Sequence, residues 1–475
     1  METTDPSAEQ TPIKLRRVGY SLLAALLLTG ITWLSGASVD RIGIAAIATL
    51  TIALWITEAI PLGAASLLPL VLVPMLPSFT LERTVADYTN PVVFLFLGGL
   101  ILARAIEVTH LHRLLAYRIL RFWGQTSHAV LLGFVTATAF LSMWISNTAA
   151  AVIMLPLAAA VAERLGKEWK NLEKSLYLGV AWSASIGGLA TLIGSPPNAV
   201  FAAFIRRETG VEVSFLQWAA IGAPFAAVGV VLLWQYFCRI SPRIPNKSLP
   251  SDLIELLKSP DSSDSFLGRN RKIVGAIFVG VVALWCLRPL IGWKGVTDHQ
   301  ISLAAGALLL LIPAGAKPLT GPRLLRFADL RAIPWSILLL VGGGLSLSTV
   351  ITDSGLIAEL TQQLNFVGNW PMWLGVAAIV ALVIFATEFG SNTAIVTLFL
   401  PTTVVFAPLL GIELYSLALA IAMAGSLSFM MPMATPPNAA VFAKGHVTIR
   451  DMMWFGMPLN LVFAALITAV ALLVR

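Results

Sequence analysis

The sequence has few charged residues for its length. Asp, Glu, Lys and Arg make up 12% of the 475 residues, whereas a typical soluble domain contains about 25%. Hydrophobic residues make up 57%. A water-soluble fold cannot bury this much apolar surface, so a large part of the surface must face lipid.

Cysteine is also scarce, and only Cys238 and Cys286 occur. Two cysteines cannot build a disulfide framework or a cysteine-rich metal cluster, so we expect both to be small buried hydrophobic residues. The five histidines do not have the spacing of a metal site. An H-E-x-x-H motif and other recognised catalytic constellations are missing as well. These absences argue against an intramembrane enzyme.

Long apolar stretches are what the sequence does contain. Many reach the roughly 20 residues that a spanning helix requires. They are continuously apolar and do not alternate with polar residues, which favours helices over a membrane β-barrel. We therefore predict an all-α polytopic membrane protein with about 11 transmembrane helices. The spans are predicted at 18–36, 41–60, 62–78, 92–110, 178–204, 215–238, 273–292, 298–315, 334–352, 413–443 and 452–474.

Two further apolar stretches, about 127–162 and about 371–410, are predicted to be hairpins that leave the membrane on the side where they entered. With this topology, most of the 31 Lys and Arg residues lie on the side of the N-terminus, as the positive-inside rule requires. The prediction places the protein in a plasma (inner) membrane, with its N-terminus cytoplasmic and its C-terminus outside. The net charge of +7 then reflects topology and indicates no nucleic-acid partner.

The chain divides into five predicted segments. Residues 1–17 form a polar cytoplasmic tail, and 18–40 form a first transmembrane helix that is retained and not cleaved as a signal peptide. A long polar stretch, 240–272, reads as a cytoplasmic linker. It separates two larger parts, 41–239 and 273–475, which are predicted to be copies of one unit.

The internal repeat rests on matched motifs. "SNTAAAVIMLP" at 146–156 is matched by "SNTAIVTLFLP" at 391–401, and Pro-Pro-Asn-Ala occurs at 196–199 and again at 436–439. The same features in the same order indicate one unit written twice. The predicted topology makes the copies opposite in direction, which is typical of a secondary transporter. Each copy then contains one hairpin and one broken helix, at about 178–204 and about 413–443.

Both motifs have a physical use inside a membrane. A proline doublet breaks a helix and frees carbonyl groups, which is tolerated only where the backbone is buried in protein or lines a cavity. Ser, Asn and Thr offer neutral donors and acceptors, so they can bind an ion or a substrate without placing a permanent charge in lipid. We expect the two hairpin tips and the two broken helices to converge on one site near the middle of the membrane.

These motifs resemble those of the divalent-anion/sodium symporter family, in its branch of sodium-dependent di- and tricarboxylate carriers. The matching residues include "TEFGSNTAIVTLFLP", "IGSPPN", "MATPPN" and "TEAIPL", and the likeness covers nearly the whole chain after Leu50. The resemblance implies a homodimer in which each protomer has a scaffold domain and a transport domain that moves as an elevator. It also implies sodium as the coupling ion and C4-dicarboxylates such as succinate, malate and fumarate as substrates.

The family pattern assigns roles to individual residues. The implied substrate contacts are Asn147, Thr148, Asn392, Thr393, Thr435 and Pro436. The first implied sodium site consists of Ser142, Ser146, Asn147 and the carbonyl of Gly194, and the second of Thr387, Ser391, Asn392 and the carbonyl of Ala434. Oxygen ligands suit a hard cation, and bound sodium would offset the negative charge of a dicarboxylate in a region that lacks Lys and Arg.

Several alternatives stay open from the sequence. The same fold also serves dicarboxylate exchangers and sodium-coupled citrate or sulfate carriers, and an ion channel is a further, less favoured class. Ser195 stands where many family members have Thr. Glu388 has no counterpart in the first copy, where Met143 takes its place. A buried carboxylate in a membrane suggests a role with protons or in specificity, but a structural cap or an ion pair within the hairpin is an equal hypothesis.

Overall fold

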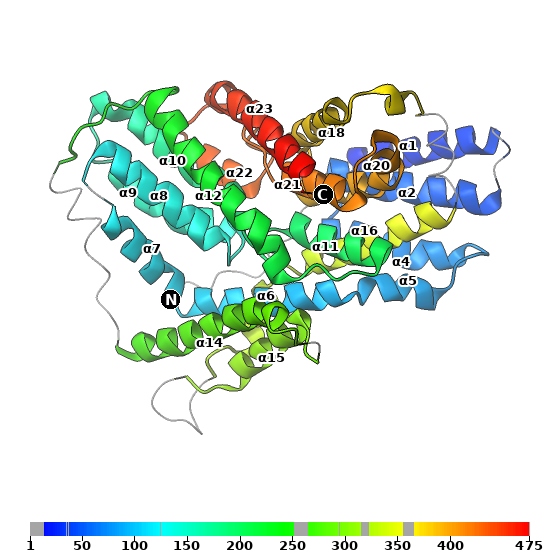
Figure 1. Ribbon diagram of the computed structural model, residues 1–475, viewed down its shortest axis with the longest axis horizontal. Coiled ribbons are helices and arrows are strands. Elements are labelled where there is room, and N and C mark those ends of the chain that lie inside the picture. Colours follow the sequence, from blue (N-terminus) through cyan, green and yellow to red (C-terminus); the bar gives the residue numbers. More distant parts are fainter. Residues whose placement is uncertain are drawn as a thin grey trace.

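The chain is built from helices in the computed structural model, as the sequence predicts (Figure 1). The structure describes residues 14–250, 265–314, 323–354 and 365–474, except residues 35, 37, 124 and 294. Within these residues there is no strand, only two isolated β-bridges. Most of the predicted tail and the middle of the predicted linker lie outside the described residues.

Eight helices of the described chain are long and apolar enough to cross a membrane. They span 15–34, 39–57, 81–108, 215–239, 268–290, 335–353, 392–410 and 449–473. Shorter apolar helices account for most other predicted spans, among them 62–75, 298–311 and 414–424. Residues 392–410 belong to the second predicted hairpin, so the count of eleven spans and the re-entry of both hairpins stay predictions.

Both predicted hairpins form pairs of packed helices that meet at a Ser-Asn-Thr tripeptide. The first pair is α8 (Ser127–Ser142) and α9 (Asn147–Ala162). The second is α18 (Met372–Thr387), followed by α19 (Asn392–Phe399), a 3-10 turn (Leu400–Thr402) and α20 (Thr403–Leu410). In each pair the second helix begins at the asparagine, and the preceding serine is its N-cap, with a non-helical backbone (ψ 145° at Ser146 and 124° at Ser391).

Both predicted broken helices are broken. In the first copy, α10 (Lys170–Gly188) and α11 (Pro196–Thr209) are separated by the seven residues 189–195. In the second copy, α21 (Leu414–Ala424) and α22 (Pro436–Phe442) are separated by 425–435. The proline doublets stand at the first two positions of α11 and α22, where the missing amide hydrogen costs no helical hydrogen bond.

The predicted helix over 62–78 is present from 62 to 75 but is not continuous. The segment folds as two short helices and a 3-10 turn, α3 (Leu62–Ala65), α4 (Leu68–Leu72) and η2 (Val73–Met75). Pro69 and Pro74 stand at the second position of the second and third pieces, because the first turn of a helix tolerates a residue without an amide hydrogen. An amphipathic helix that we did not predict, α7 (Leu111–Phe122), follows α6 (Pro91–Val108).

The other helices surround these elements. In Figure 1, α8 to α10 form one end of the molecule, α1 and α2 lie at the other, and α11 and α16 cross the middle. The remaining bounds are α1 (Leu15–Leu34), α2 (Val39–Thr57), α5 (Leu81–Tyr88), α6 (Pro91–Val108), α12 (Phe215–Arg239), α14 (Ser265–Leu290), α15 (Asp298–Leu311), α16 (Trp335–Asp353) and α23 (Ile449–Leu473), with 3-10 turns at Lys167–Trp169, Phe327–Ala332 and Asn365–Asn369.

The first half of the predicted linker packs against the start of α8. The amide of Leu249 donates to the carbonyl of Gln125 at 3.0 Å, and the amide of Ser127 donates to the carbonyl of Lys247 at 2.9 Å. These hydrogen bonds attach this end of the linker to the residues that begin α8. Its other end, from Ser265 on, is already helical as the start of α14.

The centre of the first copy is the contact between α8 and α10. Residues 175–188 of α10 are all buried. At Gly187, an added Cβ atom would lie 2.2 Å from the carbonyl oxygen of Ala139 and 2.5 Å from its Cα atom. Small residues allow such close helix packing inside membranes.

Replacing Gly187 with Ala should therefore lower the thermal stability of the protein, because α8 and α10 would have to separate. Overpacking of this kind costs about 1–3 kcal/mol. The melting temperature of the purified protein in detergent checks this. Gly280→Ala is the matched control, since a Cβ atom there meets nothing within 4 Å. Equal melting temperatures for the two variants would contradict the close approach of the helices.

Candidate functional site

One cavity of about 510 Å³ brings the two copies of the repeat together. Its lining includes both tripeptides, at 146–148 and 391–393, and both proline doublets, at 196–197 and 436–437. These residues start four helices, α9, α11, α19 and α22. Segments that are far apart in the sequence thus present their helix N-termini to one space.

The predicted site residues gather around this cavity. All six predicted substrate contacts line it, namely Asn147, Thr148, Asn392, Thr393, Thr435 and Pro436. Of the predicted sodium ligands, Ser146, Asn147, Gly194, Ser391, Asn392 and Ala434 line it as well. The other two, Ser142 and Thr387, are fully buried one helical turn before the tripeptides.

The Asn147 side-chain amide meets three oxygen atoms beside the first tripeptide. The Ser142 hydroxyl lies 2.7 Å from the side-chain amide of Asn147 and 2.6 Å from the carbonyl oxygen of Ala184. When the amide presents Nδ2, it donates to the Ser142 hydroxyl at 2.7 Å and to the carbonyls of Gly194 and Ala184 at 3.2 and 3.3 Å. When it presents Oδ1, four oxygen atoms face one another, an arrangement that a hard cation would stabilise.

The second tripeptide has a related but different surrounding. The hydroxyl of Ser428 lies 3.1 Å from Oδ1 of Asn392 and 3.2 Å from the hydroxyl of Thr387. Thr387 in turn donates to the carbonyl of Ile384 at 2.8 Å. Ser428 lies in the break between α21 and α22 and is completely buried. The oxygen-only donor set of both tripeptides fits a hard cation such as sodium.

Each broken helix is held by the asparagine of its Pro-Pro-Asn motif. Asn198 Nδ2 donates to the carbonyls ten and seven residues earlier, Gly188 and Thr191, at 2.9 and 2.8 Å. Asn438 Nδ2 repeats this with Ser428 and Met431, again ten and seven residues earlier, at 3.1 and 3.0 Å. Both side chains are fully buried, so each supplies donors to carbonyls that the break removes from their helix.

Glu388 caps the second break. Its carboxylate is 1% exposed and accepts hydrogen bonds from the side chain of Asn460 at 2.7 Å and from the backbone amides of Phe429, Met430 and Met431 at 2.8 to 3.1 Å. All these partners are donors, and a protonated carboxyl group would turn an O–H toward one of them. The geometry therefore favours a structural cap over a group that carries protons.

The opposite wall of the cavity comes from other helices. Glu58, which follows α2, and Leu62, the first residue of α3, line this side together with Ser336, Ile337 and Leu340 of α16. Glu58 is exposed, with a left-handed backbone (φ 45°) that ends α2. Among the described residues that line the cavity, it is the sole charged one, so no Lys or Arg of this part of the chain supplies a counter-charge there.

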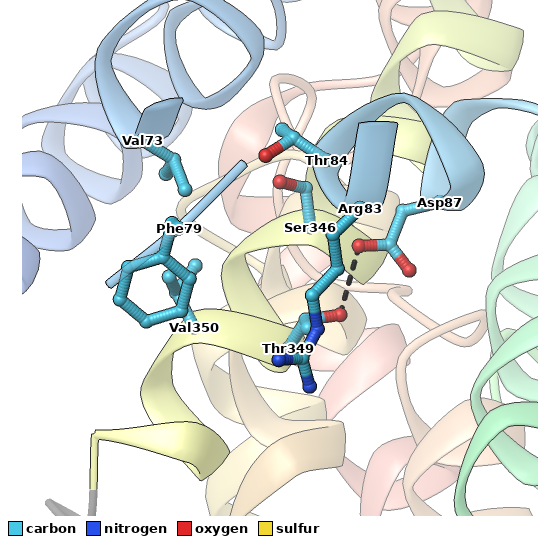
Figure 2. Close-up of a pocket in the computed structure, with 8 residues that line it drawn as sticks. All are labelled: Val73, Phe79, Arg83, Thr84, Asp87, Ser346, Thr349 and Val350. Carbon is cyan, nitrogen blue, oxygen red and sulfur yellow. Dashed lines mark hydrogen bonds between the residues drawn. The ribbon is translucent and has the colours of Figure 1, made fainter. Parts of the chain in front are cut away.

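Two other cavities do not suit a polar ligand. Figure 2 shows a space of about 10 Å³ between α5 and α16, where Thr349 donates to Asp87 at 2.8 Å. This volume holds at most one water molecule, so its polar side chains serve packing. A cavity of about 720 Å³ between α14 and α15 is lined mainly by aliphatic residues such as Val281, Leu284 and Leu308, which suits hydrocarbon and not an anion.

The sequence analysis predicted the residues of the tripeptides and proline doublets that line the cavity. It missed the buried residues whose hydrogen bonds hold these segments in place. Asn198 and Asn438 could have been found, because the repeated motif contains them and buried breaks need donors. Ser428 and Asn460 could not, because each lies far along the chain from its partner and belongs to no repeated motif. Ser195, the departure from the family pattern, lines the cavity and has no side-chain cap hydrogen bond, whereas the hydroxyl of Thr435 accepts from the amide of Asn438 at 3.2 Å.

Comparisons with known proteins agree with this architecture. The sequence profile of a family described as Citrate transporter matches residues 52–424. The Sodium-dependent dicarboxylate transporter SdcS of Staphylococcus saprophyticus is 36% identical over 430 residues, which cover 88% of this chain and 82% of the relative. SdcS of Staphylococcus aureus strain USA300 matches with the same identity and coverage.

Solved structures resemble the fold. The YdaH transporter of Alcanivorax borkumensis gives a TM-score of 0.54 at 15% identity, and the match covers 82% of this chain and 86% of that one. MtrF of Neisseria gonorrhoeae, described with a class of antimetabolite efflux pumps, gives 0.54 at 16% identity, with coverages of 82% and 83%. At these identities the likeness concerns the fold alone.

Asn438→Ala should destabilise the protein, because it leaves the buried carbonyls of Ser428 and Met431 without their side-chain donor. Each unpaired buried group costs about 1–3 kcal/mol. We expect a clear fall in melting temperature. Asn438→Asp should be no better, since it places acceptors against two carbonyls. Asn171→Ala is the control, because that exposed asparagine donates to a single carbonyl, of Arg243. A melting temperature of Asn438→Ala equal to that of the control would rule out the role given to this side chain.

Proposed function

The chain belongs to the citrate transporter family and to the divalent-anion/sodium symporters that its motifs resemble, and from this premise we propose that it imports C4-dicarboxylates such as succinate, malate or fumarate together with sodium. It is a multi-pass membrane transporter, and its relatives are transporters and not enzymes. The proposal concerns the substrate class, the coupling ion and the mechanism of movement.

The observation that carries the proposal is the set of helix N-termini around one polar cavity. The first residues of α9, α11 and α19, which have 16, 14 and 8 residues, line the cavity, together with the start of the shorter α22. A helix N-terminus carries partial positive charge and free amide groups, so it favours an anion. Several of them facing one space support a substrate with more than one carboxylate, with Asn147, Thr148, Asn392, Thr393, Thr435 and Pro436 as its contacts.

Sodium would supply the remaining positive charge. No Lys or Arg among the described residues lines the cavity, and an anion removed from water without a counter-charge pays a large desolvation penalty. The oxygen clusters beside Asn147 and Asn392 support two cation sites at the edges of the cavity. If cation and anion stabilise each other, each must raise the affinity for the other.

Two related functions keep the same fold. A dicarboxylate exchanger would bind the same anion without net sodium movement. A sodium-coupled citrate carrier would place a third carboxylate in the cavity. A sodium-coupled sulfate carrier would bind a smaller anion there. The name of the matching family supports citrate, whereas the names of the relatives support dicarboxylates.

The two-sided lining of the cavity supports an elevator mechanism. Hairpins and broken helices form the polar side and would belong to a transport domain, while α2, α3 and α16 form the other side and would belong to a scaffold domain. Spin labels at the exposed positions 152 of α9 and 335 of α16 would follow this motion. A distance that stays constant when sodium and succinate are added or withdrawn would refute it.

Assembly and orientation are part of the proposal. We expect a homodimer, which native mass measurement in detergent would reveal. The distribution of basic residues supports a cytoplasmic N-terminus and an external C-terminus. Reporter fusions at the two ends would test this, and reporters active on the same side would contradict it.

Uptake of labelled succinate into proteoliposomes should require an inward sodium gradient and should stop when choline replaces sodium. Malate and fumarate should compete. Asn147→Ala and Asn392→Ala should each reduce the uptake rate at least about tenfold, which corresponds to about 1.4 kcal/mol. Each variant removes an oxygen from the proposed substrate site and from one of the two proposed sodium sites. Asn171→Ala, outside the cavity, should transport normally.

The same vesicles separate the alternatives. Uptake without sodium that occurs only when dicarboxylate is preloaded would establish an exchanger and remove the sodium sites. Stronger competition by citrate or sulfate than by malate would change the assigned substrate to that anion. A channel would not accumulate labelled succinate against its gradient.

A further inference from the structure

The two proposed cation sites are not equivalent, although the sequence repeats their ligands. The carbonyls held by Asn198 and Asn438 define matching positions in the two breaks, ten residues before each asparagine. That position is Gly188 in the first copy and Ser428 in the second. At Gly188 an added Cβ atom would lie 2.5 Å from the side-chain amide of Asn147, so a side chain there would displace this residue of the first site, where the second site has a hydroxyl.

We propose that the Ser428 hydroxyl is a ligand of the second sodium site, and that this site therefore binds sodium more tightly than the first. The inference rests on the proposed sodium coupling and deepens it. Ser428 Oγ lies within 3.2 Å of the two groups already assigned to that site, Oδ1 of Asn392 and the hydroxyl of Thr387. All three belong to buried or half-buried side chains, and all are oxygen donors of the kind that a hard cation prefers.

The backbone that carries Ser428 is fixed from two sides. Asn438 holds its carbonyl at 3.1 Å, and Glu388 accepts hydrogen bonds from the next three amides, 429 to 431. Glu388 is thus a positioning residue, which holds Ser428 in register with the tip of the second hairpin. Asn460 of α23 completes the arrangement by donating to the same carboxylate at 2.7 Å.

Glu388 also makes the two sites electrically different. Its place in the first copy is taken by Met143, whose backbone carbonyl accepts a hydrogen bond from Thr191. The corresponding contact in the second copy is the bond from the amide of Met431 to the Glu388 carboxylate, at 2.9 Å. The second site therefore lies near a buried negative charge that the first site lacks, and in a medium of low dielectric this charge raises cation affinity.

Binding of radiolabelled sodium to the full purified protein, without dicarboxylate, tests the proposal. Wild type should show a tighter and a weaker class of site. Ser428→Ala should weaken the tighter class about tenfold, roughly 1.4 kcal/mol, and leave the weaker class unchanged. Ser428→Cys keeps the size of the side chain, so it tests the ligand role even if the alanine variant folds poorly. Because sulfur is a poor ligand for a hard cation, the cysteine variant should weaken the tighter class as much as the alanine variant does.

Matched variants isolate the hydroxyl. Ser426→Ala removes another buried serine of the same break, which donates to Ala422 at 3.1 Å, and should bind sodium like wild type. Glu388→Gln should weaken the tighter class about 10- to 100-fold, as loss of a supporting residue does in metal sites. Asn147→Ala should remove the weaker class. A general loss of stability would not spare one class of site.

Three results would overturn the inference. The first is wild-type affinity in both Ser428 variants, which would leave the hydroxyl a packing role. The second is loss of the tighter class in Asn147→Ala, which would reverse the order of the sites. The third is the absence of sodium binding in the wild type, which would also overturn the proposed coupling, whereas the first two leave sodium-dependent uptake intact.

Discussion

Backbone groups that leave a helix inside a membrane must find their partners within the protein, and the rest of this structure depends on that constraint. Water is absent from the hydrocarbon core, and each unsatisfied amide or carbonyl there costs several kcal/mol. The chain breaks two helices, at 189–195 and 425–435, and satisfies them with side chains. Asn198 and Asn438 donate to carbonyls, while Glu388 accepts from amides.

The same breaks produce the site. Because α11 and α22 restart at the proline doublets, and α9 and α19 start at the tripeptides, helix N-termini can meet in the interior of the protein, where an unbroken bundle would present only side chains. The cavity that they line is polar, and the tripeptides and proline doublets in its lining carry no formal charge. Such a site suits an anion whose charge is balanced by ions that arrive with it and by helix dipoles.

Symmetry of sequence and symmetry of structure are different things in this protein. The motifs repeat closely, and the two asparagines of the Pro-Pro-Asn motifs make hydrogen bonds at identical spacings. Yet the first break is bonded to its hairpin by the Thr191 hydroxyl, which donates to the carbonyl of Met143. The second break is bonded to its hairpin by backbone amides, such as that of Phe429, which donate to the Glu388 carboxylate. Two copies of one unit can thus keep a common frame while differing in the charge beside each site.

The sequence alone determined the helical class, the membrane setting, the two broken helices and most of the cavity lining. These follow from local signals, since apolar length, proline doublets and a repeated tripeptide act on their own segments. Only the tertiary structure decided that Glu388 reaches 429–431 and Asn460, and that Ser428 stands beside Asn392. These are contacts between residues distant along the chain, and their partners carry no common motif. They depend on how helices pack, which local preferences leave open.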